Sequence, residues 1–258
     1  MIELFLYIVI GACLGSFANV CIYRLPTNNS LFFPLSSCPL CKKKIKFYHN
    51  VPIISYCLLK GISSCCQKKI SIQYPIVELF MIFSLVFIYL INRENIFNVF
   101  LISLLVLGIV IIFFTDLKHF IIPNQITYPL SILAILLSLV KLHPFIESFV
   151  DVLVGGIVSG LILYITAKLY LTLRKKEGMG MGDVKMITMI GFWFGLQNTI
   201  FIIIFSSIVG AMLGIILISL KKIKNDQLIP FGSFLSISCF LILIISSFYD
   251  LKLNFFNF

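Results

Sequence analysis

The feature that most constrains this chain is a succession of apolar runs, each long enough to enter or cross a lipid bilayer. Hydrophobic residues make up 60% of its 258 residues and charged residues only 12%, whereas soluble domains hold about 45–50% and about 25%. A membrane span needs about 20 apolar residues, so the sequence predicts an all-α integral membrane protein. The runs lie at 2–23, 73–92, 96–115, 126–140, 150–173, 184–197, 198–220 and 229–249.

These runs predict about eight transmembrane helices. The stretch 184–220 is too long for one crossing, and Gly195, Gln197 and Asn198 offer a turn that would divide it. Its first half is short for a span, so a re-entrant segment remains an alternative there. No basic residue precedes the first run and no small-residue cleavage site follows it, so we expect a retained span rather than a signal peptide.

The net charge is +10, and the distribution of its basic residues predicts which loops lie on the cytoplasmic side. Lys and Arg gather in cytoplasmic loops. Eight spans with the N-terminus outside place all basic residues except Arg93, Lys141 and Lys252 in the inner segments 24–72, 116–125, 168–185 and 221–228. The sequence shows no basic segment interspersed with aromatic residues and no nucleic-acid-binding motif. We therefore expect the chain to contact membrane lipid and not nucleic acid.

The same pattern predicts three regions. Residues 1–23 form the first transmembrane helix, residues 24–72 form a polar cytoplasmic loop, and residues 73–258 form a seven-helix membrane domain.

The polar loop carries four cysteines that resemble a zinc site. Cys38 and Cys41 form a CxxC pair, as in zinc knuckles. Cys66 lies where the second half of another CxxC would fall, but Ser63 occupies the first-half position and Cys65 adjoins Cys66. Because adjacent cysteines rarely bind one tetrahedral ion together, the pattern leaves two alternatives open. Either the loop binds no metal, or zinc is held by Cys38, Cys41 and Cys66, with or without Cys65 as a further ligand.

Two aspartates, Asp116 and Asp183, are the most informative acids. Asp116 ends the third predicted span and Asp183 opens the sixth, so both lie at the same depth on the inner side. Acids in a membrane segment are costly and are functional candidates for that reason. The alternative is structural, with Asp183 serving only as a helix cap and Asp116 only as a helix end.

A carboxylate pair of this kind suits hydrolysis. Two neighbouring carboxylates can share one proton, so that one acts as base toward water and the other polarises a carbonyl group. Gly180 and Gly182, which precede Asp183, would leave room for a peptide backbone to approach. The residues therefore predict a membrane aspartyl peptidase with Asp116 and Asp183 as the catalytic pair.

Blocks along nearly the whole chain resemble the type IV prepilin peptidases and N-methyltransferases, a GxGD-type family of membrane aspartyl peptidases. The matching blocks are 15–20, 23–26, Cys38 with Cys41, 49–56, 70–71, 74–78, Asp116 with 122–124, 179–185 and 230–232. Their order and spacing make the resemblance specific. It implies a multi-pass protein of the bacterial cytoplasmic (inner) membrane, with its active site at the cytoplasmic face.

The resemblance also implies the substrates and cofactors. The expected substrates are prepilins of type IV pili or pseudopilins of type II secretion, each cut after a short basic leader. A second activity would methylate the new N-terminus from S-adenosylmethionine, and the N-terminal insertion would serve that step. Glu78 and Lys185 lie in matching blocks and are candidate support residues. We expect Glu177 and Asp226, near the inner face, to receive the basic leader.

Three residues depart from the family pattern. Ser63 replaces a cysteine, Gln67 stands where Gly is usual after the last cysteine, and Ser233 replaces the usual Pro after Phe231 and Gly232. The first departure bears on zinc and methylation, and none alters Asp116 or Asp183.

Two other function classes compete with the peptidase. An ion- or proton-coupled transporter could use intramembrane acids, but related halves, common in transporters, are not evident. A non-catalytic scaffold could bind a partner through the cysteine loop, although it would leave the aspartate pair unexplained.

Overall fold

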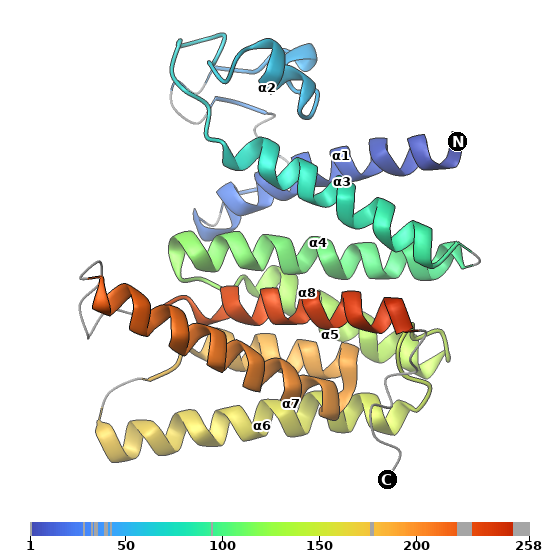
Figure 1. Ribbon diagram of the computed structural model, residues 1–258, viewed down its shortest axis with the longest axis vertical. Helices are drawn as coiled ribbons and strands as arrows, with labels where there is room; N and C mark the ends of the chain where they lie inside the picture. The colour runs from blue at the N-terminus through green and yellow to red at the C-terminus, as the bar shows by residue number, and fades with distance from the viewer. Residues whose placement is uncertain are drawn as a thin grey trace. The chain divides into compact units, whose positions relative to one another are not determined.

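The computed structural model describes residues 2–27, 29–31, 33, 36–38, 41, 43–93, 95–175, 178–220 and 229–249 (Figure 1). Within this part the regular elements are helices, and isolated β-bridges join Ser37 to Lys44 and Ile62 to Lys69. The predicted all-α class is therefore confirmed. The chain divides into two compact units, Met1–Ile111 and Ile112–Phe258, and each is described by itself.

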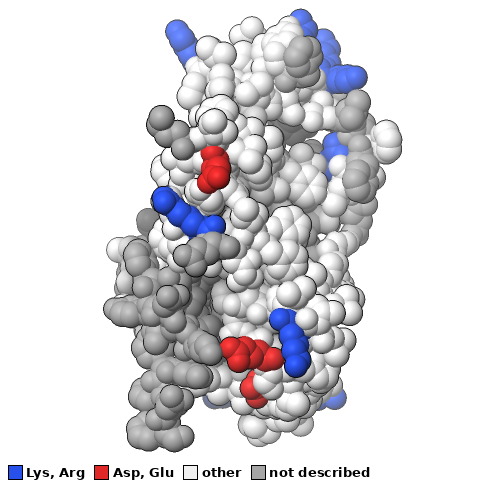
Figure 2. All heavy atoms as spheres, turned by 90° about the vertical axis from the view of Figure 1, so that its right-hand side faces the viewer, with Lys and Arg blue, Asp and Glu red and all other residues white. Residues whose placement is uncertain are grey.

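The described helices include five that are long and apolar enough to cross a membrane, namely Ile2–Thr27, Gln73–Ile91, Ile96–His119, Phe149–Arg174 and Met181–Ser219. Two shorter apolar helices, Asn124–Leu139 and Phe231–Ile245, accompany them. All eight predicted apolar runs fall on these helices, and the protein is a multi-pass membrane protein. Uncharged side chains cover most of the face drawn in Figure 2, and charged ones lie in a few small groups.

The first unit is built on an antiparallel pair of helices, α1 (Ile2–Arg24) and α3 (Gln73–Ile91). Their backbones come close because Gly11 and Gly15 face α3, and a Cβ on Gly15 would lie 2.6 Å from the Glu78 Cα. Small residues spaced by four allow such close helix contacts in membranes. The Asn19 side-chain amide donates to the Tyr74 carbonyl oxygen at 3.1 Å.

The segment between these helices holds short elements, namely η1 (Leu25–Thr27), η2 (Phe47–His49) and α2 (Ile54–Leu58). The buried Glu78 carboxylate ties this segment to α3, because it accepts a 2.7 Å hydrogen bond from the Ile53 N–H. Ile53 has a φ of 60°, which is strained for a β-branched residue. The bond to Glu78 therefore helps to hold an unfavourable turn in place.

The helix α4 (Ile96–His119) begins in the first unit and ends in the second. The second unit continues with α5 (Asn124–Leu139), α6 (Phe149–Arg174), α7 (Met181–Ser219) and α8 (Phe231–Tyr249). Glycines again set the closest approach, since a Cβ on Gly191 of α7 would lie 2.2 Å from the Gly155 carbonyl oxygen of α6. The first half of α7 therefore packs tightly along α6.

Within α7 the chain reverses at Gly195, which has non-helical φ and ψ of 75° and 172°. Gly182 and Gly214, on either side of that break, lie against Ile122 and Ile229 at one end of the unit. Gly195 instead faces Ile146, just before the start of α6. The predicted turn in this stretch is confirmed (Figure 1). As a result, the end of α4 and the starts of α7 and α8 meet at one end of the unit.

Candidate active site and cysteine centre

Asp116 lies in the last turn of α4, which continues to His119 beyond the predicted end of the span at Asp116. Its side chain is only 5% exposed. Carboxylate oxygen Oδ2 accepts a 2.7 Å hydrogen bond from the Ser233 N–H and lies 3.1 Å from the Ser233 hydroxyl. Gly232 packs flat against the same group, since a Cβ there would lie 3.1 Å from it. The start of α8 thus encloses one side of Asp116.

Asp183 lies in the first turn of α7, where Gly180 is the N-cap residue. Asp183 is the third residue of the helix rather than its N-cap residue, and its side chain still takes part in capping the helix start, as the structural alternative expects. Its Oδ2 accepts a 3.2 Å hydrogen bond from the Gly180 N–H, which holds the carboxylate against the helix start. The side chain is buried, with 9% of its surface exposed.

The structure brings the two aspartates together. Ile122, in the connection between α4 and α5, lies against both Gly182 beside Asp183 and Gly232 beside Asp116. The carboxylates are close enough for the charge of Asp116 to act on Asp183. The sequence predicted this proximity from matching depth, and two neighbouring carboxylates can share one proton.

The predicted support residues have separate places. Gly180 and Gly182 shape the start of α7, as described above. Lys185 donates a 3.1 Å hydrogen bond to the Asn124 side-chain oxygen and lies over the Tyr128 ring, 5.5 Å from its centroid. Lys185 therefore fastens α7 to α5. Glu78 belongs to the first unit, where it bonds Ile53. Glu177 and Asp226 lie outside the described residues.

Ser233 and Gly232 are the site residues that sequence reasoning missed. The sequence marked Ser233 only as a departure from a family block, and nothing in its local pattern indicates an acceptor 117 positions away. The available signal was its position near the start of the last apolar run, at the same predicted depth as both aspartates.

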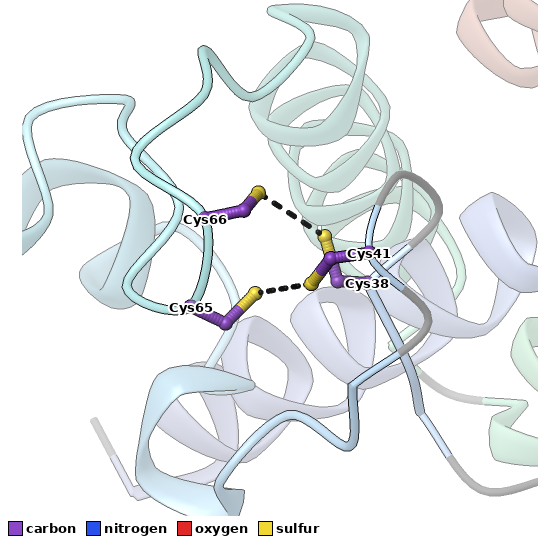
Figure 3. Close-up of side chains that lie close together, drawn as sticks. All are labelled: Cys38, Cys41, Cys65 and Cys66. Carbon is purple, nitrogen blue, oxygen red and sulfur yellow. Dashed lines mark hydrogen bonds between the residues drawn. The ribbon is translucent and has the colours of Figure 1, made fainter.

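The four cysteines of the first unit converge on one another (Figure 3). Each β-bridge closes a short turn, with Cys38 and Cys41 in one and Cys65 and Cys66 in the other. The Sγ atoms of Cys38 and Cys66 lie 3.8 Å apart, and those of Cys41 and Cys65 lie 3.1 Å apart. All four sulfurs lie within 4.8 Å of one another. The adjacency of Cys65 and Cys66 does not prevent both from facing the cluster.

This cluster fits a tetrahedral zinc ion. Four thiolates about 2.3 Å from such an ion lie about 3.8 Å from one another, which is the Cys38–Cys66 separation, and the Cys41 and Cys65 sulfurs would move apart slightly around the ion. Ser63 also reaches the cluster, since its hydroxyl lies 3.1 Å from the Cys65 Sγ. The hydrogen bond with the Cys65 thiol raises the pKa of Cys41 to about 11, so metal binding must displace a proton from that thiol.

Beside the start of the loop, the first unit has an open hollow of about 280 Å³. One wall is a face of α1, and the other comes from Asn50 and Pro52 near the Ile53 turn that Glu78 holds. The lining residues are Cys13, Ser16, Phe17, Val20, Asn50 and Pro52.

Comparisons with known proteins match both halves of the chain. Residues 9–92 match the family model described as "Bacterial Peptidase A24 N-terminal domain". Residues 103–215, which contain both aspartates, match the one described as "Type IV leader peptidase family". No solved structure matches the chain.

Relatives from three bacteria each carry the name "Prepilin leader peptidase/N-methyltransferase", and each matches this chain over most of its own length. The protein from Stutzerimonas stutzeri is 32% identical, covering 90% of this chain and 86% of that protein. The one from Vibrio cholerae is 33% identical, over 81% and 84%. The one from Neisseria gonorrhoeae is 31% identical, over 91% and 87%.

Proposed function

The chain belongs to the type IV leader peptidase family, and we propose on that premise that it removes the leader peptide of prepilins or pseudopilins with Asp116 and Asp183. The observation that carries the proposal is the buried pair itself. Two buried carboxylates from helices far apart in sequence lie near one another at one end of the second unit, where Ile122 contacts the glycine beside each of them.

The pair can hydrolyse a peptide bond without a covalent intermediate. One carboxylate takes a proton from water as the water oxygen bonds to the scissile carbonyl carbon, and the other gives its proton to the carbonyl oxygen. When the tetrahedral intermediate collapses, the leaving nitrogen takes a proton from the first group, and a hydroxyl of the intermediate returns one to the second. The pair is then ready for another turnover.

The proposed setting is the bacterial cytoplasmic membrane, with the N-terminus outside and the active site at the cytoplasmic face. The distribution of Lys and Arg supports this orientation. A basic leader would then reach the aspartates from the cytoplasm, and Glu177 and Asp226 would attract it.

The peptidase proposal is tested by substituting each aspartate. We expect Asp116→Asn and Asp183→Asn each to lower leader cleavage to below roughly one hundredth of the wild-type rate, because each removes an acid or base from the reaction. Co-expression with a type IV prepilin, followed by gel electrophoresis and mass spectrometry of the pilin, measures this. Asp151→Asn is the matched control, since Asp151 is exposed in the first turn of α6. Wild-type cleavage by a membrane-inserted Asp116→Asn or Asp183→Asn protein would refute the proposal.

We propose also that the protein methylates the new N-terminus. The support is the match of residues 9–92 to the family's N-terminal domain and the names of the relatives. S-adenosylmethionine would supply the methyl group. The hollow beside α1 is the place in the first unit to test for this ligand. The mass of the cleaved pilin decides the question, because methylation adds one methyl group to the new amine. A cleaved pilin that lacks this mass would rule methylation out.

We propose further that the cysteine centre holds one structural zinc ion through Cys38, Cys41, Cys65 and Cys66. Zinc bound there would tie the two turns of the loop together. Cys65 supplies the sulfur that Ser63 lacks, since the Ser63 hydroxyl and the Cys65 Sγ lie side by side.

Metal content tests the zinc proposal. We expect about one zinc per chain in the purified wild-type protein, and much less in Cys65→Ser, which leaves three sulfurs. The double variant Ser63→Cys/Cys65→Ser should recover the zinc, because it restores a CxxC pair at positions 63 and 66. Cys57→Ser, which changes an exposed cysteine outside the cluster, is the control. A wild-type protein without zinc, or an unchanged content in Cys65→Ser, would contradict the assignment.

A further inference from the structure

The two aspartates differ in the hydrogen bonds that they accept. Asp116 Oδ2 faces two donors of one residue, the Ser233 N–H at 2.7 Å and the Ser233 hydroxyl at 3.1 Å, and it also interacts with the Gly232 backbone. Among the described residues Asp183 accepts one longer bond, from the Gly180 N–H at 3.2 Å. Hydrogen bonds from N–H and O–H groups stabilise a carboxylate more than a neutral carboxyl group. The surroundings therefore favour negative charge on Asp116 over negative charge on Asp183.

The Ser233 hydroxyl can strengthen this preference. It lies 3.2 Å from the Phe113 carbonyl oxygen as well as 3.1 Å from Asp116 Oδ2, and its one proton serves one acceptor at a time. An ionised carboxylate is the stronger acceptor. The hydroxyl can thus turn toward Asp116 when that group is charged and toward Phe113 when it is neutral.

Within the part of the chain that the structure describes, the other charged groups near the pair leave this preference in place. On α4 itself, Lys118 and His119 follow Asp116 and are exposed. On α7, Asp183 faces Asp116, and the amine of Lys185 is bonded to Asn124 of α5. From α8, the contacts to Asp116 come from Gly232 and Ser233, which carry no charge.

We propose that Ser233 is a positioning residue that holds Asp116 as the ionised member of the pair, so that Asp183 carries the shared proton. This inference rests on the proposed peptidase function and assigns the two roles that it left open. Asp116 takes the proton of the attacking water as the C–O bond forms, and Asp183 gives its proton to the carbonyl oxygen. As the C–N bond breaks, Asp116 gives its proton to the leaving nitrogen, and a hydroxyl of the intermediate returns one to Asp183.

The pH dependence of cleavage distinguishes the two assignments. The active pair holds one proton, so the rate falls on the acid side when both groups are protonated and on the alkaline side when both are ionised. Each limb reports a proton lost by the coupled pair as a whole rather than by one aspartate alone. The group that ionises first sets the acid limb, and the group that ionises second sets the alkaline limb. Weakening the hydrogen bonds to Asp116 therefore moves the acid limb if Asp116 ionises first, and it moves the alkaline limb if Asp183 ionises first.

Two variants weaken these bonds in steps. Ser233→Ala removes the hydroxyl and keeps the N–H, whereas Ser233→Pro removes both donors. Proline is compatible with the fold because position 233 is in the first turn of α8, where N–H groups have no partner within the helix. Ser238→Ala is the control, since its hydroxyl bonds the Phe234 carbonyl oxygen further along the same helix.

The experiment measures kcat/KM against pH with purified full-length protein in detergent and a purified type IV prepilin. We expect the acid limb to move to higher pH by about half a unit in Ser233→Ala and about one unit in Ser233→Pro. The alkaline limb should stay in place, and Ser238→Ala should match the wild type.

An alkaline limb that moves instead, or unchanged limbs in Ser233→Ala, would overturn the assignment while the peptidase stands. A lower kcat/KM with both limbs at their wild-type pH would likewise mean that Ser233 has only a structural role. The peptidase proposal itself is tested separately: it fails if the Asp116→Asn or Asp183→Asn protein still cleaves the prepilin. Because Ser233→Ala removes only one buried oxygen, the inference can be tested even if Ser233→Pro does not fold.

Discussion

Gly232 sits where any side chain would press on the active site. A Cβ at this position would lie 2.8 Å from the Ile122 Cδ1 and 3.1 Å from the Asp116 carboxylate. The first atom ends a flexible side chain and can move, but the carboxylate is held by Ser233. Glycine at 232 therefore leaves room for the Asp116 carboxylate at the position where Ser233 holds it.

At this scale we predict that Gly232→Ala lowers leader cleavage by roughly tenfold or more, because small displacements of catalytic groups are costly. The rate of prepilin cleavage at equal amounts of membrane-inserted protein measures the effect. Gly214→Ala is the matched control, since its nearest neighbour is the end of the Ile229 side chain at 2.9 Å. Equal rates for Gly232→Ala and the wild type would show that this close contact has no bearing on catalysis.

Single residues also explain two departures from the family pattern. Gln67, at a position where the resemblance suggests Gly, adopts a φ of 58°, in the left-handed region that Gly occupies without strain. The local backbone is therefore of the kind that a glycine suits, although the side chain differs. Ser63 likewise keeps its place beside the cysteine cluster, and the neighbouring Cys65 provides a fourth sulfur.

At the scale of elements, the seam between α6 and the first half of α7 orients the helix that carries Asp183. Gly155 and Gly191 let the two backbones touch, and the Ser159 hydroxyl is buried in the same contact. Without water to compete, such close packing is what holds helices together in a membrane. The contacts with α6 begin about one turn beyond Asp183, at Ile187 and Thr188, so the seam fixes the direction in which that helix start points.

We predict that Gly191→Ala destabilises the protein by about 1–3 kcal/mol, because the added methyl group would lie 2.2 Å from the Gly155 carbonyl oxygen and the rigid backbones must separate. Thermal unfolding in detergent, followed as the loss of the monodisperse protein peak in size-exclusion chromatography after heating, should show a lower midpoint temperature for Gly191→Ala than for the wild type. Gly210→Ala should cost much less, since its nearest neighbour is the movable Phe234 ring at 3.1 Å. Similar midpoints for Gly191→Ala and the wild type would mean that the seam is not tight.

At the scale of the whole molecule, the chain consists of a first unit with the cysteine centre and a second unit with the aspartate pair. The division lies at residues 111 and 112, inside α4, whereas the family models meet between residues 92 and 103. The predicted regions 1–23, 24–72 and 73–258 stay a prediction about organisation. Both the cysteine centre and the aspartate pair are complete within one unit each.

The sequence by itself determined the class of the protein, the succession of apolar runs and the two aspartates, because each rests on local composition. Apolar runs must be buried in lipid or protein wherever they lie, and acids at a membrane edge stand out because they are costly there. The tertiary structure alone decided which donors reach Asp116, that Cys65 and Cys66 both face the cluster, and that Glu78 supports Ile53. These contacts join residues up to 117 positions apart, and such pairings arise only when the packed helices bring the side chains together.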